Sequence, residues 1–178
     1  MTKPATISAL APIMQMAFVP SDFEAAIKYW TGTMGVGPFF LLENIQLGDL
    51  TYMGEPTDAI FSVAIAYWND IQIELVRPEN DGLAHYSGKY DVRDALHHTC
   101  HVVVDIEEAR RTVLDAGGTI VVSGRVGEDG HVFYADPGFG PGGLVEYIQL
   151  ATGGAEFFKM MQDAAVDWDG SDPVRKIG

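Results

Sequence analysis

One order of elements occurs twice along the 178 residues, and this repeat limits the fold more than any other feature of the sequence. The first copy begins with a β-prone run at 13–19 followed by a helical pattern, and the second begins the same way at 97–104. Three further β-like runs follow each helix. Both halves therefore predict β-α-β-β-β, about 80 residues apart.

Each predicted helix has its own start signal. Ser21 and Glu24 form the S-x-x-E pattern of a capping box, with Asp22 between them, and Asp105 opens the second helix. Glycine-rich segments end both helices. Behind each start the apolar residues fall on one helical face, at Phe23, Ala26, Ile27 and Trp30 in the first copy and at Ile106, Ala109, Val113 and Leu114 in the second.

The expected strands lie after each helix. They are 38–46, 59–68 and 71–78, with a short extra piece at 50–54, in the first copy, and 119–126, 131–137 and 143–150 in the second. Such a duplication predicts an α+β fold. Its two tandem βαβββ modules form a pseudo-twofold, partly closed, mixed β-sheet groove.

The repeat also predicts how the chain is divided. We assign 10–80 to the first module, 81–96 to a linker, 97–152 to the second module and 153–178 to a C-terminal helix and tail, all in one globular unit. The linker is polar and turn-rich, so we expect it to cross the surface. Within the last segment, 155–168 has an amphipathic helical pattern, and 170–178 is expected to trail.

Four polar residues interrupt apolar strands at matching places in the two modules. Gln15 and His98 each precede their helix-start aspartate by seven residues, and Glu74 and Glu146 each lie midway along the closing strand of a module. If the modules are related by a twofold axis, these four side chains converge in the groove. This symmetry makes them the candidate functional residues.

The four side chains have the chemistry of a metal site. A carboxylate that points inward from an apolar strand is costly unless it is paired or bound to a cation. One imidazole, two carboxylates and one amide oxygen suit Zn, Ni, Co, Mn or Fe(II), and they leave coordination positions open for substrate. The only cysteine, Cys100, excludes an internal disulfide framework and a multi-cysteine zinc site.

Three segments carry a resemblance to a known family. HHTCHVVVDIEEA, IELVRP and DPGFGPGGLVEYIQL resemble strand and turn motifs of the vicinal oxygen chelate superfamily, which includes glyoxalase I, methylmalonyl-CoA epimerase, extradiol dioxygenases and bleomycin-resistance proteins. FEAAIKYWTGTMGVGPFF is similar to the helix-to-strand joint of the epimerase branch. The resemblance covers roughly residues 13–150 and is nearest to the glyoxalase–epimerase branch.

The resemblance implies a site and a reaction. It places the ligands of one divalent metal ion on Gln15, Glu74, His98 and Glu146. It implies a lyase or isomerase, glyoxalase-like or epimerase-like, that acts through an enolate held by the metal on a small substrate with vicinal oxygens. Glu146 is the expected proton-transfer base, Glu74 its alternate, and Glu43 a further candidate if the groove is epimerase-like. Gln15 stands where ring-cleaving dioxygenases need a histidine, which argues against an oxygenase. The family also suggests a homodimer.

Other interpretations of the same residues remain open. A metal-free protein that sequesters a small molecule would use the same groove, and a non-catalytic dimer is a third class. Gln15 could instead satisfy backbone groups, Glu74 could face solvent, and His98 could be a hydrogen-bonded histidine at a strand start. No segment marks a coenzyme A or glutathione pocket, and the sequence leaves open whether modules pair within one chain or swap between chains.

Several residues near the four candidates have other expected roles. His97 and His101 are offset from His98 by odd numbers, so they are expected on the opposite face of the strand, as packing residues or residues that support a ligand rather than as ligands themselves. Cys100 shares the face of His98 and is expected to be a small buried hydrophobe. In the linker, His85, Tyr86 and Tyr90 either touch substrate or face solvent.

The charge balance excludes some partners. Eleven Lys and Arg stand against 25 Asp and Glu, for a net charge of −14. Such a surface repels nucleic-acid phosphates and anionic lipid. The sequence has no apolar run of roughly 20 residues that could span a membrane and no signal-peptide pattern at its start. We therefore expect a cytoplasmic protein whose partner is a small molecule, with no nucleic acid or membrane partner.

Overall fold

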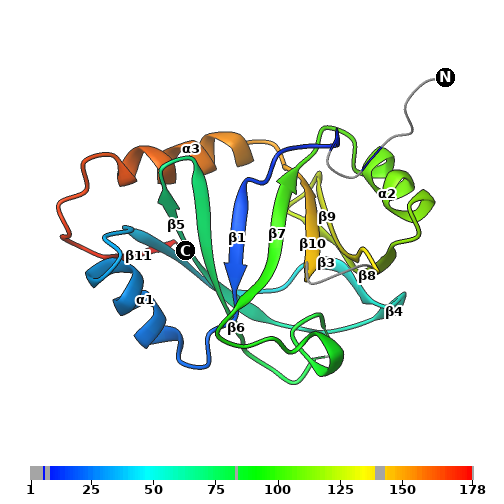
Figure 1. Cartoon of the computed structure of the whole chain (residues 1–178), viewed down its shortest axis with the longest axis horizontal. Coiled ribbons are helices and arrows are strands. Elements are labelled where there is room, and N and C mark those ends of the chain that lie inside the picture. The colour runs from blue at the N-terminus through cyan, green and yellow to red at the C-terminus, as the bar shows by residue number, and fades with distance from the viewer. Residues whose placement is uncertain (1–5, 7–8, 83, 139–142, 178) are drawn as a thin grey trace.

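The computed structural model of the protein describes residues 6, 9–82, 84–138 and 143–177 (Figure 1). Its helices are α1 (Phe23–Gly32), α2 (Ile106–Asp115) and α3 (Gly154–Ala165), with a 3-10 turn at Gly88–Tyr90. Its strands are β1 (Gln15–Phe18), β2 (Phe39–Ile45), β3 (Gly48–Tyr52), β4 (Glu55–Pro56), β5 (Phe61–Trp68), β6 (Ile71–Pro78), β7 (Leu96–Val102), β8 (Thr119–Val126), β9 (Gly130–Asp136), β10 (Leu144–Gln149) and β11 (Val174–Ile177).

All of these strands belong to one mixed sheet, in the order β11-β2-β5-β6-β1-β7-β10-β9-β8-β3-β4. β1 and β7, the first strands of the two modules, pair antiparallel at its centre (Figure 1). On either side of this pair the remaining strands of each module follow in matching order, β6-β5-β2 and β10-β9-β8. The predicted α+β fold with two βαβββ modules is confirmed, and the modules pair within one chain.

The sheet is curved so far that its two ends approach each other. β2 ends at Ile45 and β3 begins at Gly48, yet β3 pairs with β8 on the far side of the sheet. Three Cα–Cα steps cover at most ~11 Å, so the β2 and β8 sides of the sheet must lie within that reach. The sheet therefore forms a partly closed groove whose gap is crossed by a two-residue connection.

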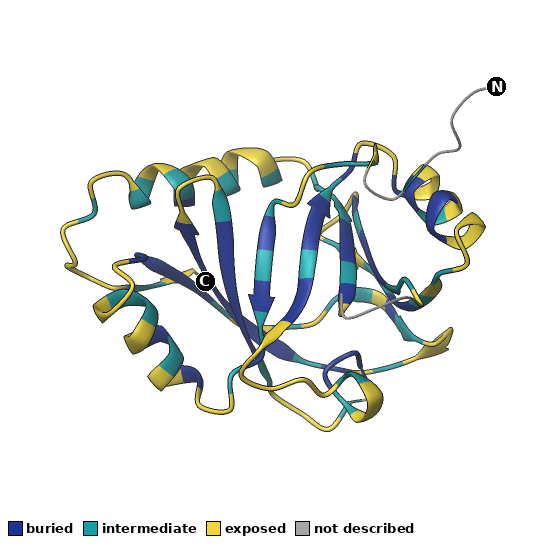
Figure 2. Ribbon diagram, in the orientation of Figure 1, coloured by how far each residue is buried: buried dark blue, intermediate teal, exposed yellow. Residues whose placement is uncertain are grey.

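The two faces of the sheet have separate cores. α1 and α2 cover the convex face, each over its own cluster of buried side chains, one around Phe39 and Leu75 and one around Phe133 and Tyr147. The concave face holds the largest cluster, to which α3 contributes Met161. Figure 2 shows the result: the central strands are largely buried, and the helices expose their outer faces. Within the described ranges, no helix is long and apolar enough to cross a membrane.

Both helix starts use an aspartate as N-cap. Asp105 accepts hydrogen bonds from the backbone N–H groups of Glu107 and Glu108, as its position predicts. In α1 the N-cap is Asp22 rather than the serine of the predicted capping box. Ser21 instead donates both its backbone N–H and its hydroxyl to Asp94, because the end of the linker passes this helix start.

Two segments that were expected on the surface are part of the packed structure. In the linker, His85 and Tyr86 are only 2% and 5% exposed, because their rings pack onto the concave core. Aromatic rings bury enough area to outweigh the polar residues around them. The tail does not simply trail: β11 pairs parallel with β2 and extends the edge of the sheet.

Candidate functional site

Strand register brings the four symmetry-related polar residues to one face. Ala17 pairs with Glu74 on one side and with His98 on the other, and Gln15 pairs with Cys100, which pairs with Glu146. Residues in register on neighbouring strands point to the same face of a sheet. All four polar side chains therefore lie on the concave face, and all four are buried.

Three of the four form a tight cluster. One ligand-type atom from each of Glu74, His98 and Glu146 lies within 4.8 Å of the others. His98 Nε2 is 3.4 Å from Glu74 Oε2 and 3.2 Å from Glu146 Oε2. Despite these distances, Nε2 has no partner of hydrogen-bond geometry among the described residues. The histidine thus faces two carboxylates without being hydrogen-bonded to either.

The cluster shifts the titration of its own members. Burial alone would lower the pKa of His98, but the carboxylates of Glu146 and Glu74 outweigh it and raise this pKa to about 9. Burial raises the pKa of the Glu74 carboxyl; His98 opposes that rise and Glu146 adds to it. In the protein without a cation, a proton on His98 therefore offsets part of the negative charge.

Gln15 lines the same cavity, and a chain of hydrogen bonds through Gln72 orients its amide. Its Nε2 donates to Gln72 Oε1 at 3.0 Å, and Gln72 Nε2 donates to the hydroxyl of Tyr67 at 2.7 Å. Gln15 Oε1 is buried and lacks a hydrogen-bond partner in the described part of the chain. Gln72 thus turns the amide of Gln15 so that its ligand-type oxygen is left free. Gln72 was not predicted as a site residue, although it lies two residues before Glu74 and so on the same face.

The face predicted for His97 is wrong, whereas its predicted place beside a candidate ligand, rather than among the ligands, agrees with its contact to His98. Ala17 pairs with His98 and Phe18 with Leu96, so His97 is the extra residue of a β-bulge. A bulge bends the strand and redirects the side chain, and the ring of His97 consequently reaches His98. His101 contacts the carbonyl of Ala11 and stacks on Tyr147, a residue of the convex core, which fits the opposite face.

His97 sets the hydrogen-bonding state of His98. His97 Nε2 lies 2.9 Å from the carbonyl oxygen of His85 and 3.0 Å from that of Tyr90, so it must carry a hydrogen. Burial lowers the pKa of His97 to about 4, so the ring is neutral and its Nδ1 is an acceptor. His98 Nδ1, 2.9 Å away, is therefore the donor. This bond leaves His98 Nε2 directed at the two carboxylates.

The cluster lies at the floor of a cavity of about 200 Å³. Cys100 and Tyr134 are beside it, and burial raises the pKa of the Cys100 thiol well above its ordinary value, so this cysteine is a neutral wall residue. Apolar residues of both modules and of α3 form the remaining walls: Met14, Leu42, Ile45, Leu47, Phe61, Val63, Ile65, Val126, Val132, Ile148, Leu150, Ala151, Gly154, Phe157 and Phe158.

Other candidate residues lie outside this cavity. Glu43 is on the outer surface, where Lys176 Nζ lies 2.7 Å from its carboxylate, so it is not placed to act on a molecule in the cavity. His85 lies behind His98, between the rings of Tyr86 and Tyr134, and burial keeps its pKa well below the ordinary value. Tyr90 donates its hydroxyl to Asp136.

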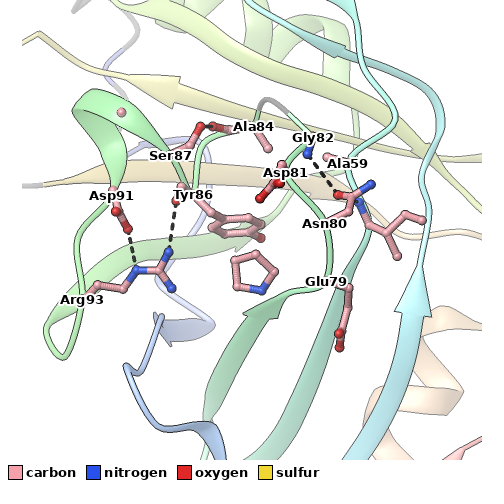
Figure 3. A pocket seen from close by; sticks show the side chains of 13 residues that line it. Ala59, Glu79, Asn80, Asp81, Gly82, Ala84, Tyr86, Ser87, Asp91 and Arg93 are labelled. Carbon is pink, nitrogen blue, oxygen red and sulfur yellow. Dashed lines mark hydrogen bonds and ion pairs between the residues drawn. The ribbon is translucent and has the colours of Figure 1, made fainter.

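A larger hollow of about 410 Å³ lies where the linker passes the ends of β5 and β6 (Figure 3). Three of its four charged side chains already have partners, because Arg93 binds Asp91 and Glu79 binds Arg77, and the fourth, Asp81, is exposed to solvent. The inner cavity differs because Gln15 Oε1 and His98 Nε2 at its floor are buried and have no hydrogen-bond partner among the described residues. We therefore take the inner cavity as the functional site.

A match to a known protein family agrees with this architecture. The sequence profile of the glyoxalase/bleomycin resistance protein/dioxygenase superfamily matches residues 14–134. No protein with a curated description matches the sequence.

Several solved structures have a fold similar to that of this chain. The methylmalonyl-CoA epimerase of Streptomyces coelicolor, in complex with 2-nitronate-propionyl-CoA, is 18% identical with a TM-score of 0.58, over 80% of this chain and 99% of that one. The epimerase of Mycobacterium tuberculosis is 16% identical with a TM-score of 0.53, over 80% and 90%. A hypothetical protein of Bacillus halodurans is 17% identical with a TM-score of 0.54, over 79% and 94%.

Proposed function

The chain belongs to the glyoxalase/bleomycin resistance protein/dioxygenase superfamily, and from that premise we propose that it is a divalent-metal-dependent lyase or isomerase, glyoxalase-like or epimerase-like. Its substrate is a small molecule with vicinal oxygens, and the reaction moves a proton at the carbon next to a carbonyl. The observation that carries the proposal is the buried cluster of Glu74, His98 and Glu146 at the floor of an otherwise apolar cavity.

The residues present fit a divalent cation. Two carboxylates are buried together, and their only close cationic group among the described residues is the imidazole between them. Leaving such a pair buried is costly, and a bound cation removes that cost. Gln15 Oε1 and His98 Nε2 are buried and have no hydrogen-bond partner in the described part of the chain, and both are atoms of the type that binds metals. One nitrogen and three oxygens suit Zn, Ni, Co, Mn or Fe(II).

When bound, such an ion would polarise a substrate carbonyl and acidify the adjacent C–H. The protein's own residues supply the other parts of the reaction. Glu146 is the proposed base that accepts and returns the proton, with Glu74 as the alternate. His97 and Gln72 hold His98 and Gln15 in their ligand orientations. The apolar walls exclude water and so strengthen the electrostatic interactions at the floor.

A metal-free binding protein is the alternative function in the same superfamily. It would use the apolar cavity and would have no need of two buried carboxylates facing an imidazole. The retained cluster therefore favours the enzyme. The proposed homodimer is independent of this choice, because one chain already encloses the cavity with residues of both modules and α3.

Metal content is the test of the proposal. Elemental mass spectrometry of the purified wild type should find about one divalent ion per chain, and His98→Ala and Glu146→Ala should lose it. His101→Ala is the matched control, because His101 is a buried histidine of the same strand on the opposite face. A wild type that holds no divalent ion even after reconstitution would rule out the metal-dependent reaction and favour the binding protein.

A further inference from the structure

The charge distribution of the cavity carries information about its occupant. Among the described residues that line it, the polar ones are confined to the floor: Gln15, Glu74, Cys100, Tyr134 and Glu146. None of these lining residues is a lysine or an arginine. A carboxylate or phosphate brought into the cavity would therefore find no cationic side chain on the walls.

Most of the cationic side chains that the structure describes form ion pairs elsewhere. Arg77 contacts Glu79, Lys89 contacts Asp136, Arg125 contacts Asp49 and Lys176 contacts Glu43, all in surface pairs outside the cavity lining. The chain as a whole has a net charge of −14. An anionic substrate would thus be repelled on approach, and a charge on its body, away from the floor, would remain unpaired once inside.

The size of the cavity limits the occupant further. At about 200 Å³ it is smaller than the ~300–1,000 Å³ of sites that enclose drug-sized ligands. Phe157 and Phe158 of α3 form an aromatic wall over the strands. The space inside the cavity therefore suits a compact molecule with an apolar, ring-sized body.

We propose that the substrate is an uncharged, mainly apolar molecule whose single polar end carries the vicinal oxygens, rather than a coenzyme A thioester or a glutathione adduct. The inference of a polar end depends on the proposed function, because this end would contact the cluster at the floor. The inference of an apolar, uncharged body depends on the wall residues alone. The aromatic face of α3 then acts as a specificity determinant.

A matched pair of probes tests this substrate class. 2-Hydroxyacetophenone and 4-(2-hydroxyacetyl)benzoic acid carry the same vicinal oxygens and differ by one carboxylate. Calorimetric titration should show the neutral probe binding at least ~30-fold more tightly to the wild type, because the carboxylate would be buried without a partner. Comparable or tighter binding of the anionic probe overturns the proposal, and so does the absence of binding by both probes at millimolar concentration.

Variants of α3 locate the selectivity. Phe158→Arg places a cation on the cavity wall and should reduce the preference for the neutral probe by ~10-fold or more. Met160→Arg is the matched control, because Met160 lies on the same helix but is exposed and does not line the cavity. It should leave the preference unchanged. Equal effects of the two variants would show that long-range charge, not the wall, sets the preference, and would overturn the proposal.

Failure of this inference can be told from failure of the proposed function. A protein that binds no metal and exchanges no C–H proton, but keeps the preference for the neutral probe, disproves the reaction and supports the substrate class. A protein that binds metal and exchanges the proton, but binds both probes equally, supports the reaction and disproves the substrate class.

Discussion

His97 Nδ1 lies 2.9 Å from His98 Nδ1, and this contact joins a residue of a β-bulge to the centre of the buried cluster. Two backbone carbonyls hold the far side of the His97 ring, so its orientation is determined by the end of the linker as well as by β7. Residues behind a metal-ligating histidine commonly fix its tautomer and orientation. The same role is expected for His97.

Replacing His97 should weaken metal binding without removing a ligand. His97→Phe keeps a ring but removes the acceptor for His98 Nδ1–H, so we expect metal affinity to fall ~10-fold or more. Long-range ¹H–¹⁵N NMR correlations of the metal-loaded protein should show that the His98 tautomer is no longer single. His101→Phe serves as the control on the opposite face. Unchanged affinity and an unchanged His98 spectrum would mean that His97 is only a packing residue.

The two carboxylates should be separable by isosteric substitution. Glu146→Gln keeps an oxygen near the cluster but cannot accept a proton, so we expect metal to be retained while C–H exchange of a bound α-hydroxyketone in heavy water falls ~100-fold or more. Glu74→Gln should retain more exchange. If Glu74→Gln instead causes the greater loss, the roles of the two residues are reversed.

Gly143 sets how closely β10 approaches β7 at the site. It has a positive φ of 65°, and a Cβ at this position would lie 2.8 Å from the carbonyl oxygen of His97. Gly143→Ala should therefore lower the free energy of unfolding by ~1 kcal/mol more than Gly88→Ala does, since Gly88 has a similar φ but open space around it. Urea unfolding measures both; equal losses would show that only backbone strain matters.

Asp94 should make stability depend on pH. Hydrogen bonds from the hydroxyl and backbone N–H of Ser21 lower the pKa of Asp94 below its ordinary value. A carboxyl whose pKa is lower in the folded state adds stability above its unfolded pKa, and this contribution is lost as the pH falls through the folded value. Asp94→Asn should thus unfold more easily than the wild type at pH 7.

The comparison of Asp94→Asn with the wild type should be repeated at acidic pH. At a pH well below the lowered pKa of Asp94 the two proteins should converge, because protonation has then removed the same interaction from the wild type. Thermal unfolding followed by circular dichroism at both pH values measures this. A difference that persists undiminished in acid would mean that the charge of Asp94 is not what ties the linker to α1.

The sequence determined the features that depend on neighbours a few residues apart. The 3.6-residue apolar spacing and the start signals at Ser21 and Asp105 predicted α1 and α2, although Asp22 rather than Ser21 caps α1, and alternation predicted the main strands. The duplication also predicted the site, because it made Gln15 equivalent to His98 and Glu74 equivalent to Glu146 from their positions in the sequence alone. Since equivalent residues of a repeated module occupy equivalent positions, convergence of these four followed from symmetry.

Features that depend on contacts between distant segments could not be predicted from local patterns in the sequence. The bulge at His97 arises from pairing with β1, about 80 residues earlier, and no local pattern in β7 reveals it. His85 is buried because the linker brings its ring against Tyr134 of β9, about 50 residues later in the chain. Glu43 points outward because β2 lies near the edge of a curved sheet, next to β11. In each case the deciding term is the pairing of segments far apart in sequence, which the periodicity of a single segment does not encode.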